Sequence, residues 1–419
     1  MTTVSIQHRW AKKPLGKVAD VVSGYAFKSS EFGDQGIPVI KIKNIRVGSV
    51  DLFNVDRVYE KYLTIPDRYH VRPGDVLISL TGSHISQPNS VVGRVAMHSP
   101  ALPHCLLNQR VGKVIVRDVS TCELSFLFYA LIEPETMRAI AMKAHGAANQ
   151  ANVSPAQIES IEIPIPPLSV QRRIAGILSA YDELMENSQR RIRILEDMAR
   201  VIYREWFVHF RFPGHEKLPR IASPLGDIPQ GWEMKKLGEL ISYNRQATKP
   251  GPHLDERKYV PIDCLPSKSL ALLEAKPIEE AQSSLQLFEK GNILFGAMRP
   301  YFHKVVIAPF AGVTRTTCFV FKTAKPEWNA FATMTAFEEA TVAYANAHSQ
   351  GATIPYAVWD GSLAEMPLVL PPDALLRRFE KIAAPMLSRI SQSFFTLNNL
   401  RRTRDLLLPR LLSGQVSLS

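Results

Sequence analysis

The sequence predicts an α+β protein in which two mixed α/β domains are separated by two long helices. We expect these helices to pair as an antiparallel intramolecular coiled coil, which gives the chain pseudo-two-fold symmetry. Three observations support this fold. A stretch of about fifty residues recurs without a gap 205 positions later. Both copies carry a heptad pattern of apolar residues. A tandem proline precedes each heptad pattern, and it marks a sharp boundary because proline fixes φ and disfavours helix before it.

The repeat is visible in identical residues spread along the stretch: Gly146 and Gly351, Val153 and Val358, Pro166 and Pro371, Arg172 and Arg377, Leu195 and Leu400. Solenoid and propeller units are only about 20–50 residues long, so this period indicates two domain-sized copies of one module. The preceding parts are related more loosely, because Trp10 corresponds to Trp232 at a displacement of 222. We therefore expect two divergent domains on a conserved helical frame, suited to a two-part target.

These features divide the 419 residues into four segments. The first domain is predicted at 1–167, the central helical region at 168–212, the second domain at 213–372 and the C-terminal helical region at 373–419. A prior of roughly 150 residues per domain agrees with more than one unit.

The two domains show a mixed strand-and-turn pattern. Residues 39–43 alternate apolar and basic side chains, which predicts a half-buried strand. Residues 75–80 follow an Arg-Pro-Gly turn and predict a buried strand, and 292–295 follow Lys-Gly in the same way.

The helical regions carry apolar residues at alternating spacings of three and four, the pattern of a coiled-coil seam. The first seam consists of Leu178, Tyr181, Met185, Ser188, Ile192, Leu195, Ala199, Ile202 and Trp206. The second consists of Ala383, Met386, Ile390, Ser393, Leu397, Leu400, Arg404, Leu407 and Leu411. A helix packed on its own domain is the alternative, but two matched seams favour mutual pairing. Pro385 is expected to kink the second helix or delay its start, and Gly414 to end it.

Composition describes a soluble cytoplasmic protein. The chain is 46% apolar, has no apolar run near the roughly 18 residues of a membrane span, and begins without a secretory signal. Its four cysteines form no CxxC pair, so we expect free buried thiols rather than zinc or disulfides. The net charge of +11 and pI of 9.4 suit a polyanion partner. That signal is weak, because residues 213–372 contain 16 basic and 16 acidic residues.

The run Ile-Pro-Ile-Pro-Pro-Leu-Ser-Val-Gln-Arg-Arg-Ile at 163–174 resembles the motif that follows the recognition domain in specificity subunits of type I restriction-modification systems. Gln171 and Ile174 match, whereas Val170 stands where that family usually has Glu. Segments 24–29, 72–75, 81–82 and 108–110 are similar to motifs of its recognition domain. The second copy is looser: Leu-Pro-Pro-Asp at 370–373 lacks the Glu-Gln pair, and 291–294 and 299–301 are weaker matches. The order and duplication of the motifs carry the resemblance, which covers essentially the whole chain.

The resemblance implies a non-catalytic subunit whose two target recognition domains each read one half of a bipartite asymmetric DNA site. It implies two modification subunits that bind S-adenosylmethionine and methylate adenine, and two restriction subunits that use ATP and Mg²⁺ to translocate and cut. No cofactor is then expected on this chain itself. Helix length would set the spacing between the half-sites.

Three alternatives stay open. One is the recognition subunit of a related bipartite system that cuts on both sides of its site. Another is a coiled-coil scaffold that never contacts DNA. The third is a self-contained nuclease or methyltransferase, for which the sequence offers little. It has no phosphate-cradling GxxxxGK[ST] loop and no Asn/Asp-Pro-Pro-aromatic tetrad. Asp263 with Glu274 and Lys276 is nuclease-like, but the first copy has no equivalent.

Base reading requires Arg, Lys, Asn or Gln at groove edges, and phosphate binding uses Lys, Arg, Ser or Thr. In the first domain we expect DNA contacts from Tyr25, Lys28, Lys41, Lys43, Asn44, Arg46, Thr81, Ser83, His84, Gln87, Arg94, Gln109, Arg110, Asn149, Gln150 and Asn152. In the second we expect them from Arg245, Lys249, Arg299, Tyr301, His303, Lys304, Thr316 and Gln350. For each residue the alternative is an exposed polar group without a partner. His84 and His303 lack a second ligand at metal spacing, so no metal site is expected.

Overall fold

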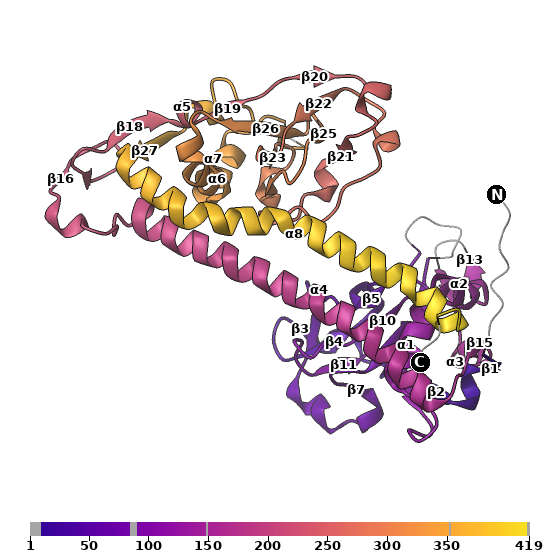
Figure 1. Cartoon of the computed structure of the whole chain (residues 1–419). Coiled ribbons are helices and arrows are strands. Elements are labelled where there is room, and N and C mark those ends of the chain that lie inside the picture. The colour runs from indigo at the N-terminus through magenta and orange to yellow at the C-terminus, as the bar shows by residue number, and fades with distance from the viewer. Residues whose placement is uncertain (1–9, 84–89, 148–149, 352, 417–419) are drawn as a thin grey trace. The chain divides into compact units, whose positions relative to one another are not determined.

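A computed structural model describes residues 10–83, 90–147, 150–351 and 353–416 (Figure 1). The predicted contacts His84, Gln87 and Asn149 lie outside these ranges. The chain forms two compact units, unit 1 (Met1–Glu183 with Arg402–Ser419) and unit 2 (Leu184–Arg401). Two long helices, α4 (Leu168–Tyr203) and α8 (Asp373–Ser413), each contribute a segment to both units. The predicted division into four segments stays a prediction.

Unit 1 contains two five-stranded sheets. One has the order β2 (Ala19–Ser23), β12 (Val111–Val116), β8 (Val76–Ser79), β10 (Val95–Met97) and β5 (Gly48–Ser49). The other has the order β3 (Phe32–Gly33), β6 (Asp56–Val58), β4 (Ile37–Ile40), β11 (Cys105–Leu107) and β7 (His70–Val71). A three-stranded sheet joins β13 (His145–Ala147), β14 (Gln150–Asn152) and β9 (Thr81–Gly82). All four residues of β8 are buried, as the apolar run Val-Leu-Ile at its start predicts.

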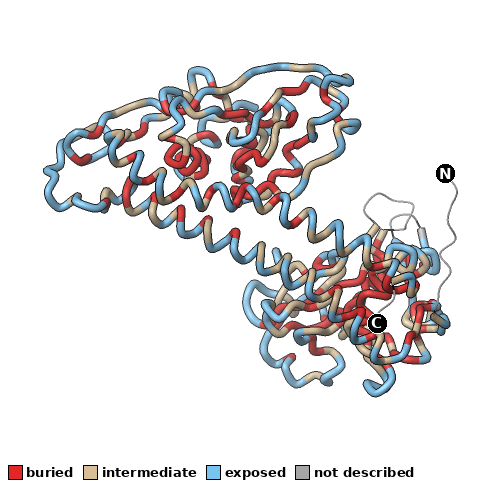
Figure 2. The backbone as a smooth tube through the Cα atoms, in the orientation of Figure 1, coloured by how far each residue is buried: buried red, intermediate tan, exposed pale blue. Residues whose placement is uncertain are grey.

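The core of unit 1 includes segments of both long helices. Helix α1 (Leu124–Ile132) packs against β8 and β10, α3 (Pro155–Glu159) against β2, and α2 (Pro134–Met142) against α1. One buried cluster contains Ile78 of β8, Phe126 of α1, Leu178 of α4 and Leu411 of α8. In Figure 2 the buried residues along the chain are drawn in red. The start of α4 and the end of α8 are therefore part of this domain's hydrophobic core.

Unit 2 repeats the plan with two four-stranded sheets. The first orders β19 (Ile241–Tyr243), β26 (Cys318–Thr323), β23 (Ile293–Gly296) and β24 (Val305–Ile307). The second orders β20 (Ala247–Thr248), β22 (Leu285–Phe288), β25 (Gly312–Arg315) and β21 (Lys258–Tyr259). The unit also contains α5 (Leu237–Leu240), α6 (Asn329–Phe337), α7 (Glu339–Ala347) and the short pair β16 (Arg220–Ile221) and β17 (Ile228–Pro229).

Equivalent backbone hydrogen bonds relate the two units. The bond from Leu15 N to Ile161 O in unit 1 corresponds to the bond from Leu237 N to Met366 O in unit 2. Inside the sheets, the bond from Leu80 N to Arg110 O corresponds to the bond from Ala297 N to Thr317 O. In both units an early strand also pairs antiparallel with the last strand: β1 (Lys12–Pro14) with β15 (Glu162–Pro164), and β18 (Glu233–Lys236) with β27 (Pro367–Leu370). The two domains are divergent copies of one fold.

The gapless register predicted from the sequence is wrong at one point. Val153 N donates to Leu80 O at 2.9 Å, and the equivalent bond in unit 2 joins Ala357 N to Ala297 O at 2.8 Å. Val153 therefore corresponds to Ala357, at a displacement of 204, although Ile161 and Met366 restore the displacement of 205. The hairpin that precedes Ala357 is one residue shorter in the second copy, because loops accept length changes that strands do not.

The residues at the predicted seam positions of both helices are all buried or half-buried. In unit 2, Ile192 of α4 shares one buried cluster with Ile390 and Leu397 of α8. In unit 1, Leu178 near the start of α4 shares a cluster with Leu411 near the end of α8. In each unit, therefore, α4 and α8 contribute to the same core. Continuous coiled-coil pairing of the helices stays a prediction.

Two local predictions are wrong. The strand expected at 39–43 ends at Ile40, all four residues of β4 are buried, and Ile42–Asn44 forms the short 3-10 helix η3. The Asn44 side chain ends the strand by accepting a hydrogen bond from Lys41 N at 3.0 Å. The delayed start of α8 that Pro385 was expected to cause is wrong, because α8 begins at Asp373, whereas the alternative, a kink, stays a prediction. Both Pro385 and Lys381 are exposed, so water is available to the carbonyl that loses its helical partner.

Other expectations agree with the structure. Gly414 follows the last residue of α8 with a positive φ of 76°, the conformation that ends helices at glycine. Cys105, Cys122, Cys264 and Cys318 are free and buried. Among the helices described, none is long and apolar enough to cross a membrane.

Candidate nucleic-acid interface

Several of the predicted contact segments of unit 1 meet at the turn between β11 and β12. Tyr25 N donates to Leu107 O at 2.7 Å, and Gln109 N donates back to Tyr25 O at 2.9 Å. Gly24 makes this approach possible, because a Cβ there would lie 2.4 Å from the carbonyl oxygens of Leu107 and Asn108. The two family-like segments 24–29 and 108–110 are therefore one structural feature, with Gln109 and Arg110 exposed beside it.

Two further segments join the same turn. Asn108 N donates to Ile40 O at 3.1 Å, which places the segment that begins at Lys41 beside it. Leu80 N donates to Arg110 O at 2.9 Å, so that Thr81 follows directly. Backbone hydrogen bonds of the sheet, rather than side-chain contacts, thus bring the segments together.

Lys41 and Lys43 share one carboxylate. Both ammonium groups lie 2.9 Å from Asp56 Oδ2, and Lys41 also lies 3.5 Å from the ring centroid of Phe32. Burial raises the pKa of Asp56, but the hydrogen bonds and charges of the two lysines outweigh it and hold the pKa below its usual value. The carboxylate is therefore ionised at neutral pH, and the three groups present one net positive charge.

The remaining predicted residues of this region are partly engaged. Arg46 pairs with Asp51 at 3.1 Å, and the Asn44 amide donates to Asp51 O at 2.9 Å. Burial and the nearby charge of Arg46 lower the pKa of Arg94, whose Nε donates to Ser90 O at 2.8 Å. Lys28 is exposed at the end of the Tyr25 segment.

The hairpin β13–β14 pairs with β9 and so forms another part of the candidate interface. Thr81 Oγ1 donates to Asn152 Oδ1 at 2.8 Å, which leaves the exposed Asn152 amide N–H₂ available as a donor. Gln150 is exposed on the same strand, and the Ser83 carbonyl accepts from Ser90 Oγ at 2.6 Å. Thr81 and Gly82 themselves form strand β9.

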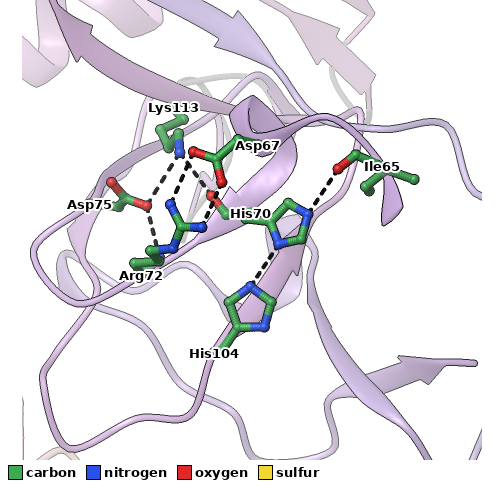
Figure 3. Close-up of polar contacts among 7 residues, drawn as sticks. All are labelled: Ile65, Asp67, His70, Arg72, Asp75, His104 and Lys113. Carbon is green, nitrogen blue, oxygen red and sulfur yellow. Dashed lines mark hydrogen bonds and ion pairs between the residues drawn. The ribbon is translucent and has the colours of Figure 1, made fainter. Parts of the chain in front are cut away.

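The Arg72-to-Asp75 turn, also family-like, is held by a polar network (Figure 3). Arg72 binds Asp67 through both terminal nitrogens at 2.6 and 3.0 Å, and its backbone N donates to Asp75 Oδ2 at 2.8 Å. The buried Lys113 donates to His70 O at 2.8 Å and lies 3.4 Å from Asp75. These partners assign the turn a structural role, that of fixing the start of β8.

A histidine pair extends this network. His70 Nδ1 lies 2.9 Å from His104 Nε2, and His70 Nε2 lies 3.0 Å from Ile65 O (Figure 3). Burial, together with the charges of His70 and Arg72, lowers the pKa of His104. A neutral pair satisfies these contacts, with His70 Nε2 donating to the carbonyl and Nδ1 accepting from His104.

In unit 2 the equivalent turn lies between β25 and β26. Ala297 N donates to Thr317 O at 2.8 Å, so Thr316 occupies the place that Gln109 has in unit 1. Arg299 N donates to Pro355 O at 2.8 Å, and Gln350 pairs with Tyr356 through two backbone hydrogen bonds. Thr316 and Gln350 are exposed and Arg299 is half-buried.

Other predicted residues of unit 2 lie apart from this turn or are engaged. Arg245 pairs with Asp360 and lies over the ring of Tyr243, while Lys249 is exposed near β20. His303 is buried, with Nε2 2.9 Å from Phe337 O, and Lys304 Nζ donates to Ile262 O at 2.9 Å. The partners of His303 and Lys304 give both side chains a role in holding the fold.

Sequence reasoning missed two residues at this turn. Tyr356 occupies the place of Asn152, which the one-residue difference in the hairpin hid from a fixed displacement of 205. Arg315, exposed at the end of β25, occupies the place of Asn108 and acts electrostatically on both Tyr356 and Tyr259. Strand pairing, rather than sequence identity, identifies Tyr356 and Arg315 as the equivalents of Asn152 and Asn108.

The nuclease-like pattern in unit 2 has ordinary surface partners. Lys276 Nζ lies 3.1 Å from Glu280, and Lys276 exchanges backbone hydrogen bonds with Tyr259. Within the described ranges, no group of three or more His, Cys, Asp or Glu side chains is placed to hold a metal ion.

Comparison with known proteins gives consistent matches. Residues 7–196 match the family of type I restriction modification DNA specificity domains. The type I restriction enzyme MjaIX specificity subunit of Methanocaldococcus jannaschii is 24% identical over 429 residues, which cover 97% of this chain and 93% of that protein. The EcoBI specificity subunit of Escherichia coli is 27% identical over 191 residues, covering 45% of this chain and 36% of that protein.

Among solved structures, the S subunit of a type I restriction-modification system from M. genitalium matches with a TM-score of 0.58 and 15% identity. The match covers 98% of each chain. At this identity the likeness supports the fold, a mixed α/β chain with long helices.

Proposed function

This chain belongs to the family of type I restriction-modification specificity subunits, and from that premise we propose that it reads a bipartite, asymmetric DNA site. Each unit would bind one half of the site through the segments around its sheet turn. The chain itself would be non-catalytic and act through partner subunits.

The observation that carries this proposal is the presence of two equivalent turns with different side chains. Gln109 in unit 1 corresponds to Thr316 in unit 2, and Asn152 corresponds to Tyr356. A shared backbone presents each set at the same place in its own domain, whereas the donors and acceptors differ. Two unlike sets of donors would read two unlike half-sites, because base edges in the major groove differ in their donor and acceptor pattern.

The long helices would fix the spacing of the half-sites. Helix α4 has 36 residues, and a helix of that size is about 54 Å long at about 1.5 Å per residue. One DNA turn is about 34–36 Å, so helices of this size match the scale of an interrupted site. We propose that α4 and α8 pair as an antiparallel coiled coil and thereby set the spacer.

The partners we propose are duplex DNA, two modification subunits and two restriction subunits, in the cytoplasm. S-adenosylmethionine would bind the modification subunits, and ATP with Mg²⁺ the restriction subunits. The resemblance to the family is what supports this assignment of cofactors to the partner subunits.

Mapping methylated adenines in the host genome, with and without this gene, tests the proposal. The expected result is an interrupted motif with two unlike halves that loses methylation when the gene is deleted. Unchanged methylation at every motif after deletion would contradict the proposal. Cleavage of DNA at fixed positions on both sides of the motif would instead indicate the related bipartite system.

A further inference from the structure

Unusual backbone conformations gather at one loop of unit 2. Lys268, Arg299 and His303 adopt positive φ angles of 56°, 52° and 51°, a region that residues other than glycine rarely occupy. Lys268 N donates to His303 O at 2.8 Å, so the three belong to one feature. Conformations of this kind cluster at ligand clamps, where the surrounding structure enforces them.

The loop presents two exposed aromatic rings. The short 3-10 helix η11 (Pro300–Phe302) lies between Arg299 and His303. Tyr301 and Phe302 are 51% and 44% exposed, with ring centroids 4.7 Å apart. Because the flanking residues are both left-handed, the chain turns sharply on either side and displays the pair at its tip. We call Tyr301 and Phe302 the aromatic pair.

Buried contacts fix the base of this loop. The His303 ring is buried and lies 2.9 Å from Phe337 O, and Arg299 N donates to Pro355 O at 2.8 Å. The neighbouring Lys268 segment is held by Glu196 of α4, which accepts from Ser269 Oγ and Leu270 N at 2.7 Å each. The backbone below the aromatic pair is thus anchored to helices α4 and α6 and to the hairpin that contains Pro355. Such anchoring suits a rigid insertion element, which loses little conformational entropy on binding.

The aromatic pair adjoins the candidate interface of unit 2 and has cations beside it. Arg299 precedes it and follows Met298, which pairs with Tyr356. The exposed Lys268 lies at its base, where its backbone N donates to His303 O. Lys268 and Arg299 thus place two cations beside the aromatic pair, which favours a polyanion over an apolar protein partner.

We propose that the aromatic pair is a wedge that enters the base stack of the half-site bound by unit 2, while Lys268 and Arg299 hold the adjacent phosphates. Apolar side chains that enter between base steps unstack them, and aromatic rings stack on the exposed base face. The inference rests on the proposed function and adds a mode of recognition to it, by sequence-dependent deformability rather than by base edges alone.

The experiment uses the full chain assembled with its modification subunits and a duplex that contains the mapped site. 2-Aminopurine replaces one base at a time across both halves, with the methylated adenines left unlabelled, because modification enzymes flip their target base. The variants are Tyr301→Ala with Phe302→Ala, and Tyr301→Leu with Phe302→Leu, which keeps apolar bulk without flat rings. Phe395→Ala is the matched control, since Phe395 on α8 is also 44% exposed.

The wild-type complex is expected to raise 2-aminopurine fluorescence at one base step. The alanine double variant should lose that rise and bind about 10- to 100-fold more weakly, the range expected for one or two stacked bases. The leucine double variant should keep part of the rise, because leucine can still separate a base step, but should bind more weakly than wild type because it has no flat ring to stack on a base. Phe395→Ala should match wild type in both measurements.

Each other outcome is informative. If the alanine variant binds the site with unchanged affinity and an unchanged fluorescence profile, the wedge is overturned and bipartite reading stands. If the variant fails to assemble with the modification subunits while its circular dichroism is unchanged, the pair is a protein-docking surface and the wedge is again overturned. If the wild-type complex shows no site-specific binding, both proposals fail.

Discussion

Arg404 of α8 donates a hydrogen bond to Asp182 of α4 at 2.7 Å, although the heptad pattern places an apolar residue at position 404. Tyr129 of α1 donates to the other oxygen of the same carboxylate at 2.7 Å. The side chains of Arg404 and Asp182 are 23% and 32% exposed. Arg404 also pairs with the neighbouring Asp405 at 2.8 Å. A charged pair at one position of the predicted, largely apolar seam would specify register, because a slip would leave the half-buried Asp182 carboxylate without its cation.

Arg404→Met is therefore expected to destabilise unit 1, by about 1–3 kcal/mol, since it leaves Asp182 half-buried without its cation. Adding Asp182→Asn should recover part of the loss, because the amide oxygen still accepts from Tyr129. Denaturant unfolding of the four proteins of this double-mutant cycle measures the coupling. Arg402→Met, at an exposed neighbouring position, is the control. A coupling energy near zero would contradict the role assigned to the pair.

Asp56→Asn should increase DNA affinity by releasing the charge that Lys41 and Lys43 now share. We expect tighter binding of all sequences alike and a slope of log K against log salt that steepens by up to about one. Replacing both lysines by alanine should have the opposite effect. Fluorescence anisotropy with specific and unrelated duplexes over a salt series measures both. Identical slopes in all three proteins would exclude these lysines from the phosphate contacts.

Gly24→Ala should destabilise unit 1 by about 1–3 kcal/mol, because the new methyl group would overlap the carbonyl oxygens of Leu107 and Asn108. Its effect on DNA binding should be larger than its effect on unfolding, since the same approach positions Tyr25 and Gln109. Gly33→Ala, where no heavy atom lies within 4 Å, should change neither. Thermal unfolding and anisotropy distinguish the two effects.

Gln109 and Thr316 occupy equivalent places in the two copies. Gln109→Ala and Thr316→Ala should therefore each relax the base preference at one position, and the two positions should lie in different half-sites. For Gln109→Ala the loss of a base-edge contact is expected to cost about 1–3 kcal/mol on the specific site only. Selection of bound sequences from a random duplex pool measures the change. A change in both halves from a single substitution would contradict one unit per half-site.

Glu196 should make unit 2 more stable at mildly acidic pH. Burial raises the pKa of its carboxyl group above the usual value, although Ser269 and Leu270 donate to it. Because the folded pKa lies above the unfolded one, this stabilisation is fully present below the unfolded pKa and is lost as pH rises through the folded pKa. Glu196→Gln keeps the acceptor without the charge.

The test of this prediction is the melting temperature of wild type and Glu196→Gln between pH 5 and 8. As pH rises, the melting temperature of Glu196→Gln should increase relative to that of wild type. If the two melting temperatures change with pH in parallel, the prediction is wrong.

Much of the architecture could be predicted because the sequence repeats it. The buried strands β8 and β23 lie where apolar runs follow Arg-Pro-Gly and Lys-Gly turns. The heptad pattern selected helix positions that are all buried or half-buried. These features depend on periodicity and turn residues, which are local in sequence.

The candidate interface was less predictable because its partners are distant in sequence. Asn44 ends a strand that alternation alone would continue, and Asp56 neutralises part of a basic segment from thirteen residues beyond Lys43. His303 and Lys304 are polar residues whose partners, Phe337 and Ile262, lie in other elements. Tyr356 was hidden by a change in loop length. Composition of a segment does not reveal which of its charges tertiary structure has already matched.

In each unit a strand near the start of the domain lies against the strand that ends it, as β1 pairs with β15 and β18 with β27. A domain whose two junctions adjoin on one ladder is joined to the rest of the chain like a cassette. Exchange of everything between those junctions for a homologous segment would leave α4 and α8 uninterrupted, and the residues that such a segment must retain are those that pack on the two helices.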